Sequence, residues 1–199
     1  MPRTRTRAYH HGDLRAELLQ RAETTLRESG VDGLSLRQLA RDVGVSHAAP
    51  TRHFKDKQAL LDALAVSGFQ QLGAALEQSA ACDSVGGHIR DMARTYLRFA
   101  TENSALLALM FARRHSPAAS DAMSEAVDRA FAAPVALIAD AQARGEVIAG
   151  EPRRIALSAV AILQGLATFV GSGVIAAEAA DELLDEMISH MLDGLRPRR

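Results

Sequence analysis

SLRQLARDVGVSHAAPTRHF, residues 35–54, is the stretch of this 199-residue chain that decides its fold. Ser35 and Gln38 match a capping box, in which the serine caps a helix and the glutamine reaches back to its first turn. We expect this helix to end at Gly44, because glycine readily adopts the left-handed backbone that a sharp turn needs. A second short helix is expected over residues 46–54, and such a pair is the helix-turn-helix pattern.

The second helix of this pair has two distinct faces. Pro50 and Phe54 are one turn apart and are expected to point inward together. The outward face is small at its start and polar or basic after it, with His47, Ala48, Thr51 and Arg52. A face of this kind suits the major groove of DNA, which is about 12 Å wide. The alternative is a helical hairpin inside an ordinary core, because short helix pairs are common.

Helical periodicity continues along the rest of the chain. Leu14, Leu18, Ala22 and Leu26 recur at every fourth residue, which indicates one buried face of a helix. A long helix with a wide apolar stripe is expected after Asp56, and further helices at roughly 88–102, 104–112, 120–145, 152–170 and 178–193. No strand-like alternation persists, so we predict an all-α fold of about nine helices.

The charges are unevenly distributed. The net charge is −1, but residues 1–57 carry 11 Lys/Arg and 7 Asp/Glu, a balance of +4. Residues 58–199 carry 12 and 17, a balance of −5. The N-terminal part is therefore the candidate for contact with a polyanion. A single cysteine, Cys82, excludes an intramolecular disulfide, fits a reduced cytoplasmic setting, and is either an inert small residue or a redox sensor.

One segment, residues 155–177, is uncharged for 23 residues, which is long enough to span a bilayer. The mid-segment Gln164 and the break at Gly171–Gly173 favour a core or subunit-interface helix instead. The paired His10 and His11 diverge in direction and have no evident partner ligand, so we expect no metal site and no cofactor. We also expect no enzyme, because no catalytic triad or Gly-rich phosphate loop stands out. The first alternative to DNA binding is a membrane-anchored helical module, and the second is a helical enzyme.

The segments LSLRQLARDVGVS (34–46) and RHFKDKQALL (52–61) carry a family resemblance. Together they make residues 9–61 resemble the DNA-binding domain of TetR/AcrR-type regulators. YHHGDLR (9–15), VSHAAP (45–50) and FATENSALLALMF (99–111) are similar to the branch with a WHG-type C-terminal domain. Leu163-Gln164-Gly165 lies where that branch has Trp-His-Gly, so the pattern is only partly matched.

The resemblance implies a three-helix helix-turn-helix DNA-binding domain over residues 9–56. It implies a larger helical ligand-binding and dimerisation domain over residues 57–195. A protein of this kind is a cytoplasmic homodimer, with no membrane contact, that represses from a palindromic double-stranded DNA operator. A small hydrophobic inducer releases it. The resemblance also implies a phosphate-contacting tyrosine at position 51, where this chain has the shorter Thr51.

Candidate DNA contacts follow from side-chain chemistry. Base-edge contacts are expected from His47, Ala48, Ala49 and Arg52, and Arg52 has the forked donor group that pairs with guanine. Phosphate contacts are expected from Arg37, Ser46, Thr51, His53 and Lys57. The N-terminal arm with Arg3, Arg5 and Arg7 either lies in the minor groove or is a disordered basic tail that adds non-specific affinity.

The helices after residue 88 are expected to hold the ligand and to pair the subunits. The candidate ligand-binding residues, each with plain core packing as its alternative, are Met92, Tyr96, Phe99, Met110, Phe111, Gln164, Thr168 and Phe169. The interface is expected on the helices at 152–170 and 178–193, as a two-fold four-helix contact. Its candidate residues are Ala159, Ile162, Leu166, Val170, Leu184, Met187, Ile188 and Met191.

Overall fold

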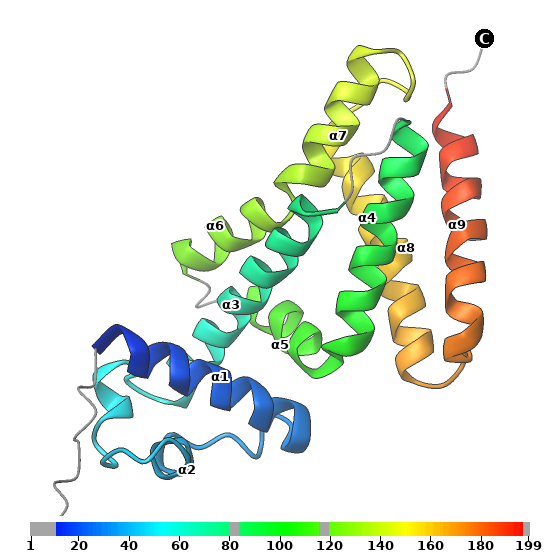
Figure 1. Cartoon of the computed structure of the whole chain (residues 1–199). Helices are drawn as coiled ribbons and strands as arrows, with labels where there is room; N and C mark the ends of the chain where they lie inside the picture. Colours follow the sequence, from blue (N-terminus) through cyan, green and yellow to red (C-terminus); the bar gives the residue numbers. More distant parts are fainter. Residues whose placement is uncertain (1–10, 80–83, 116–119, 197–199) are drawn as a thin grey trace, which may run out of the picture.

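The computed structural model describes residues 11–79, 84–115 and 120–196, and every regular element within these ranges is a helix (Figure 1). The α-helices are α1 (His11–Ser29), α2 (Leu36–Asp42), α3 (Lys57–Glu77), α4 (Val85–Glu102), α5 (Ser104–Arg114), α6 (Asp121–Ala130), α7 (Ala132–Ala143), α8 (Pro152–Gly171) and α9 (Ala180–Leu195). Two short 3-10 helices, η1 (Pro50–Arg52) and η2 (Ala177–Ala179), complete the chain order. The prediction of an all-α fold is confirmed.

The N-terminal elements α1, α2 and η1 form a small head at one end of the molecule (Figure 1). The predicted stripe of α1 is confirmed: Leu14, Leu18, Ala22 and Leu26 are all buried. Gly30 ends this helix with a φ of +66°, where its backbone N–H donates to the Leu26 carbonyl at 3.0 Å.

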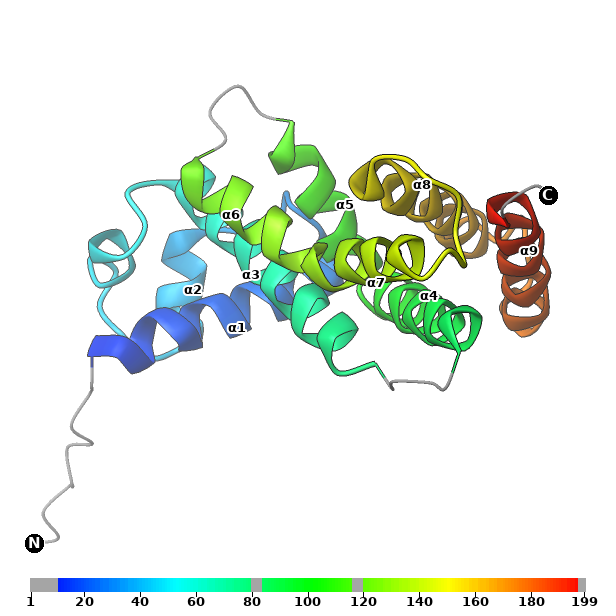
Figure 2. The same ribbon diagram turned by 90° about the horizontal axis from the view of Figure 1, so that it is seen from above.

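Helix α3 joins the head to the body, packing against α1 at its start and against α5 and α6 further along (Figure 2). Its predicted stripe is buried, with Leu60, Leu64, Phe69 and Leu72 at most 1% exposed. Two glycines on this stripe allow close approach of its neighbours. A Cβ at Gly68 would lie 2.6 Å from the Met110 sulfur of α5, and one at Gly73 would lie 2.9 Å from the Ala130 Cα of α6.

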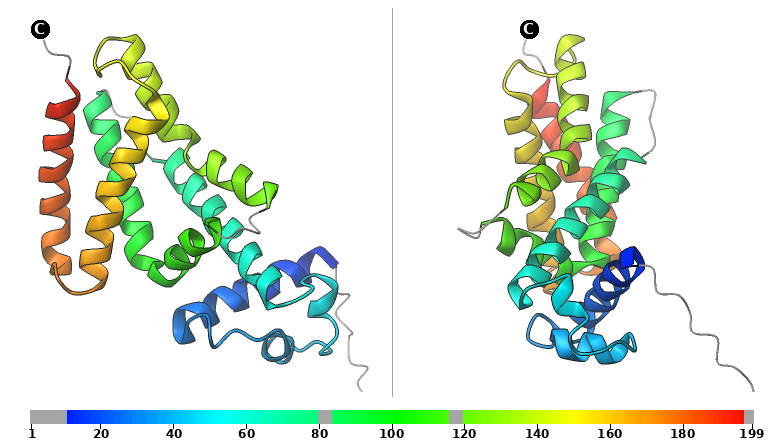
Figure 3. Two further views of the ribbon diagram at one scale, coloured as in Figure 1. Left: turned by 180° about the vertical axis from the view of Figure 1, so that it is seen from behind. Right: turned by 90° about the vertical axis from the view of Figure 1, so that its left-hand side faces the viewer.

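The rest of the body is a packed group of longer helices. Helix α4 packs against both α8 and α9, and α7 packs against α8. The Arg94 guanidinium of α4 donates to both carboxylate oxygens of Asp185 on α9 at 2.7 Å. Helices α8 and α9 lie side by side at the end of the molecule away from α1 (Figure 3).

Two predicted helices differ from the structure, although nine α-helices are present over the described ranges. The helix predicted over 120–145 is divided at Phe131 into α6 and α7. Pro134 explains the break, because it has no N–H to bond the Ala130 carbonyl. The helix predicted over 46–54 contains only η1. The Arg3, Arg5 and Arg7 arm, His10 and Cys82 lie outside the described residues.

Substitution of Gly73 by alanine should destabilise the fold. The added Cβ meets backbone of α6, which cannot move like a flexible side chain, so we expect a loss of roughly 1–3 kcal/mol in the free energy of unfolding. Gly194→Ala is the matched control, because a Cβ there meets nothing within 4 Å and α9 gains helix propensity. Urea unfolding measures both variants, and a Gly73→Ala protein as stable as Gly194→Ala would contradict the close α3–α6 contact.

Candidate nucleic-acid interface and ligand cavity

Helix α2 begins at the predicted serine but is not held by a capping box. Ser35 has the extended N-cap backbone, with φ −144° and ψ 126°, yet its hydroxyl makes no capping hydrogen bond to the described residues. The Gln38 side chain instead runs along the helix, where its Nε2 donates to Asp42 Oδ1 at 2.6 Å and its Oε1 accepts from Arg41. The capping-box prediction is therefore wrong, because carboxylate and guanidinium partners one turn ahead engage the glutamine.

A charged contact fixes α2 against α1. Arg21 Nε donates to Asp42 Oδ2 at 2.8 Å. Hydrogen bonds from Arg21 and then Gln38 lower the pKa of Asp42, and the bond to Asp42 raises the pKa of Arg21. This contact ties the end of α2, directly before the turn at Gly44, to α1.

The turn after α2 has the geometry that the sequence predicts. Gly44 has a φ of +72°, in the left-handed region that favours glycine. Directly after it, the Val45 N–H donates to the Ala40 carbonyl at 2.9 Å, and the Val45 side chain packs partly buried against the core. Pro50 and Phe54 are both buried, as predicted for an inward-facing pair.

The segment after the turn is an irregular coil of turns rather than a regular helix. The Ala49 N–H donates to the Ser46 carbonyl at 2.9 Å, in the tighter i to i+3 pattern. Proline at position 50 has no N–H, so the i to i+4 bond to Ser46 cannot form. The prediction of a regular helix from 46 to 54 is therefore wrong. Pro50 lacks the N–H that would form the i to i+4 hydrogen bond of the first helical turn.

The candidate DNA-contact residues differ in how exposed the fold leaves their side chains. Arg37, Ser46, His47, Ala48, Thr51 and Arg52 are exposed, whereas Ala49, His53 and Lys57 are half-buried. Ala49 packs against the core, so it presents little surface for a base. The Thr51 hydroxyl donates to the Ala48 carbonyl at 2.8 Å and thereby fastens the turn. Its single proton is then unavailable for a phosphate unless this bond breaks.

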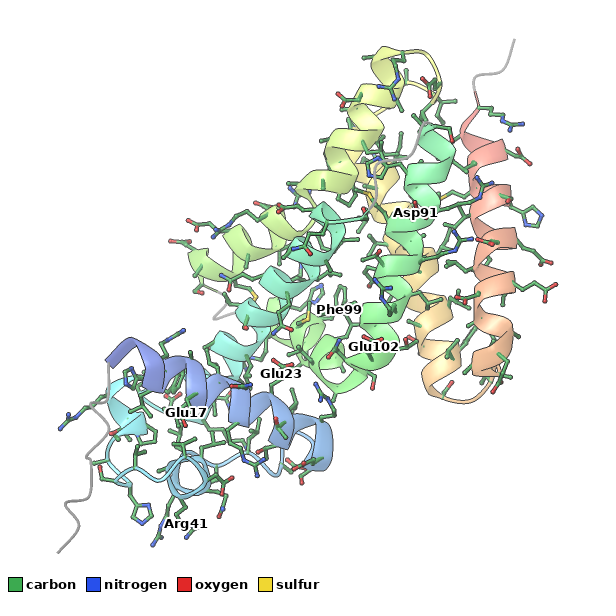
Figure 4. The ribbon with its side chains drawn as sticks, in the orientation of Figure 1. Glu17, Glu23, Arg41, Asp91, Phe99 and Glu102 are labelled. Atoms are coloured by element: carbon green, nitrogen blue, oxygen red, sulfur yellow. The ribbon has the colours of Figure 1, made fainter. Side chains whose placement is uncertain are left out.

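Two further cations belong to this surface and were not predicted. The Arg15 guanidinium of α1 lies over the Phe54 ring, 5.5 Å from its centroid, in a cation–π contact. Lys55 follows directly and is exposed. Figure 4 shows Arg41 on the side of α2 that points away from the body of the molecule. Lys55 is visible in the sequence, but the pairing of Arg15 with Phe54 depends on tertiary packing.

A small apolar cavity lies between α4, α7, α8 and α9. Its volume is about 60 Å³, and its walls include Met92, Tyr96, Leu137, Ala159, Leu163 and Ile188. None of the described residues that line it carries a charge.

A buried hydrogen bond between α4 and α8 lies at the wall of this cavity. The Tyr96 side chain is 1% exposed, and its hydroxyl donates to Gln164 Oε1 on α8 at 2.8 Å. Burial raises the pKa of Tyr96, so the phenol stays protonated and remains a donor.

The other candidate ligand residues are not gathered at the cavity. Met110 and Phe99 are core residues, and Figure 4 shows Phe99 on α4. Phe111 packs edge-on against Phe69, with ring centroids 6.1 Å apart. Thr168 and Phe169 are exposed on the far face of α8, with Phe169 52% exposed, so their assignment to the cavity is corrected.

The candidate interface residues fall into a buried group and a partly exposed group. Leu166, Leu184 and Ile188 are at most 2% exposed and belong to the core of the protomer. Ala159 and Met191 line the cavity. The assignment of Leu166, Leu184 and Ile188 to a subunit contact is corrected, because neighbouring helices of the same protomer bury them. The other five candidates, Ala159, Ile162, Val170, Met187 and Met191, remain partly exposed, and their assignment stays a prediction.

The exposed face of α8 has a different composition. Leu157 is 58% exposed and Phe169 is 52% exposed, and the small Ala161 and Gly165 lie between them at four-residue spacing.

Helices α3 and α8 are both long and apolar enough to cross a membrane, judged by length and composition alone. Over the described ranges, no three His, Cys, Asp or Glu side chains gather as a potential metal site.

Two protein-family models match this chain, one in its N-terminal part and one in its C-terminal part. Residues 18–64 match the family model described as bacterial regulatory proteins, tetR family. Residues 89–191, just over half of the chain, match the model described as tetracyclin repressor-like, C-terminal domain. The class D tetracycline repressor of Escherichia coli is 44% identical over 52 residues, which are 26% of this chain and 24% of that protein. The match to this curated relative therefore spans about a quarter of its length.

Solved structures extend the likeness to more than nine tenths of the chain. A protein of unknown function from Rhodococcus sp. RHA1 is 44% identical, with a TM-score of 0.88 over 96% of this chain and 100% of that one. A TetR family transcription regulator from Marinobacter aquaeolei VT8 shares the fold, with a TM-score of 0.75 at 17% identity over 94% of this chain and 97% of that one.

Acid should weaken the contact between α1 and α2. Because the folded pKa of Asp42 is lowered, its ionised form stabilises the fold above the unfolded value of about 3.9, and this stabilisation is lost as the pH falls through the folded pKa. Asp42→Asn should therefore be less stable than the parent at pH 7, with the difference shrinking as the pH falls below about 4. Urea unfolding across this pH range measures the effect.

Asp32→Asn is the control, since Asp32 is an exposed acid that makes no ion pair with the described residues. It should show no such convergence. A deficit of Asp42→Asn that is equal at pH 7 and pH 3 would mean that the carboxylate charge is not what holds α2.

Proposed function

This chain belongs to the TetR family of bacterial regulatory proteins, and from this premise we propose that it is a repressor that a small apolar ligand releases from a palindromic operator. Family membership makes it a DNA-binding transcription regulator and not an enzyme. Repression, the symmetry of the operator and the nature of the ligand are the parts that we propose. A cytoplasmic location is part of the same proposal, because the operator lies in the bacterial cytoplasm.

The observation that carries the proposal is an unpaired basic surface beside the turn at Gly44. Arg37, Arg52, Lys55 and Lys57 make no ion pair with the described residues. The neighbouring acids are engaged, since Asp42 binds Arg21 and Asp56 accepts from the Ala59 N–H at 2.8 Å. A surface with free cations and occupied carboxylates attracts phosphates and releases their counterions.

The side chains on this surface have different roles in the proposal. Arg52 is exposed next to the turn and is the base-reading candidate. Lys57 lies at the first residue of α3, where backbone N–H groups also favour a phosphate. We assign Thr51 to holding the turn, and we assign phosphate contact to Arg37, Lys55 and Lys57.

We assign the apolar cavity to the ligand and the exposed face of α8 to a second copy of the chain. Helices α8 and α9 form part of the cavity wall, so α8 both lines the proposed ligand site and carries the proposed subunit contact. A face with large apolar ends and small residues between them allows two helices to approach closely, which suits a two-fold contact. The opposite side of α8 is packed in the core through Ala156, Leu163 and Leu166, which favours a subunit contact over a membrane span.

Arg52 should control operator selectivity. Selection from random double-stranded DNA gives the operator, and a titration then compares it with unrelated DNA. Arg52→Ala should weaken operator binding by roughly 1–3 kcal/mol and leave binding to unrelated DNA nearly unchanged. Arg129→Ala, an exposed arginine on α6, is the control and should change neither. A selected operator without two-fold symmetry, or full selectivity in Arg52→Ala, would contradict the assignment.

The α8 face should determine the oligomeric state. Ala161→Arg places a charge in the middle of the proposed contact, so the protein should sediment near its chain mass of 21.3 kDa instead of twice that value. Ala122→Arg on the exposed surface of α6 is the control and should remain a dimer. Equal sedimentation of the two variants would place the subunit contact elsewhere.

A further inference from the structure

We propose that the ligand of this regulator is an amphipathic cation. Its apolar part would enter the cavity between α4, α7, α8 and α9. Its positive group would lie in an acidic groove formed by Glu77, His88, Asp140, Arg144 and Glu146. This inference rests on the proposed function and gives the ligand a chemical class.

The size of the cavity shows that a ligand must extend beyond it. The cavity measures about 60 Å³, which is less than half of the roughly 150 Å³ of an engineered apolar cavity that binds benzene. The acidic groove measures about 680 Å³, within the usual range for small-molecule sites. Any ligand that uses the cavity therefore places most of its volume in the groove.

The cavity and the groove are neighbours. Met92 and Leu137 line both of them, and the helices α3, α4 and α7, which supply residues to the groove, contact one another. Met92 is unbranched and can change rotamer at low cost, so it is suited to opening the wall between the two. The inner part of the ligand must be apolar, because the Tyr96 hydroxyl is already bonded to Gln164.

The charges in the groove determine the class of the outer part. Arg144 pairs with Glu146 at 2.7 Å, so these two charges cancel. Glu77 at the end of α3 and Asp140 on α7 are exposed and make no ion pair with the described residues. Among the described residues that line the groove, the carboxylates of Glu77 and Asp140 are therefore not compensated by a neighbouring cation, which favours a positive ligand group and opposes a negative one.

Three probes that differ in one group test the inference. Octyltrimethylammonium, octanol and octanoate share the same apolar chain and carry a positive, a neutral and a negative head. Titration calorimetry on the full-length protein should show the cation binding about five- to tenfold more tightly than octanol, and octanoate most weakly. This preference should shrink when salt is raised from low to high concentration.

A charge-matched pair of variants locates the effect. Glu77→Gln combined with Asp140→Asn should bring the affinity for the cation to that of octanol, while octanol binding stays unchanged. Glu17→Gln combined with Glu125→Gln removes the same charge from α1 and α6 and should keep the preference.

Each outcome decides the inference. Octanol binding with no advantage for the cation overturns it and leaves the apolar ligand site of the proposed function in place. A cation preference that survives Glu77→Gln and Asp140→Asn also overturns it. Absence of binding by all three probes overturns it as well, and the operator titration decides the DNA-binding part separately.

Discussion

The close contact of α3 with α5 and α6 is the constraint on which the remaining arrangement depends. Gly68 and Gly73 lie on the buried stripe of α3 and let Met110 and Ala130 approach its backbone. Because α3 also packs against α1, the same helix fixes the position of the head relative to the body. Helix α3 thus links the basic surface of the head to the body that holds the cavity and the acidic groove.

The sequence predicted features that depend on neighbours along the chain. The stripes of α1 and α3, the left-handed turn at Gly44 and the inward direction of Pro50 and Phe54 all follow from local periodicity and backbone preference. The head is built largely from such local signals. The all-helical fold, helix α2 and the turn after it were therefore predictable without a view of tertiary packing, whereas the regular helix expected after that turn is absent.

The remaining features depend on partners far apart in sequence. Gln38 had the residue type for a capping box, but Asp42 and Arg41 bind it instead. The contact of Arg15 with Phe54 joins residues that no local pattern relates. Helix α8 is apolar nearly all round, so periodicity could not decide which stripe faces the core and which faces outward, and Leu166 was assigned to the wrong one.

The small size of the apolar cavity has a consequence for the equilibrium between conformations. The buried side chain of Met92 lines the cavity and occupies part of the space that a larger guest would need. Under the proposed ligand assignment, a guest binds only the fraction of molecules in which this wall is open, and its apparent dissociation constant is the intrinsic value divided by that fraction. Sensitivity to the guest is thereby set by how rarely the unliganded protein opens, a quantity that core packing can tune without altering any contact to the guest.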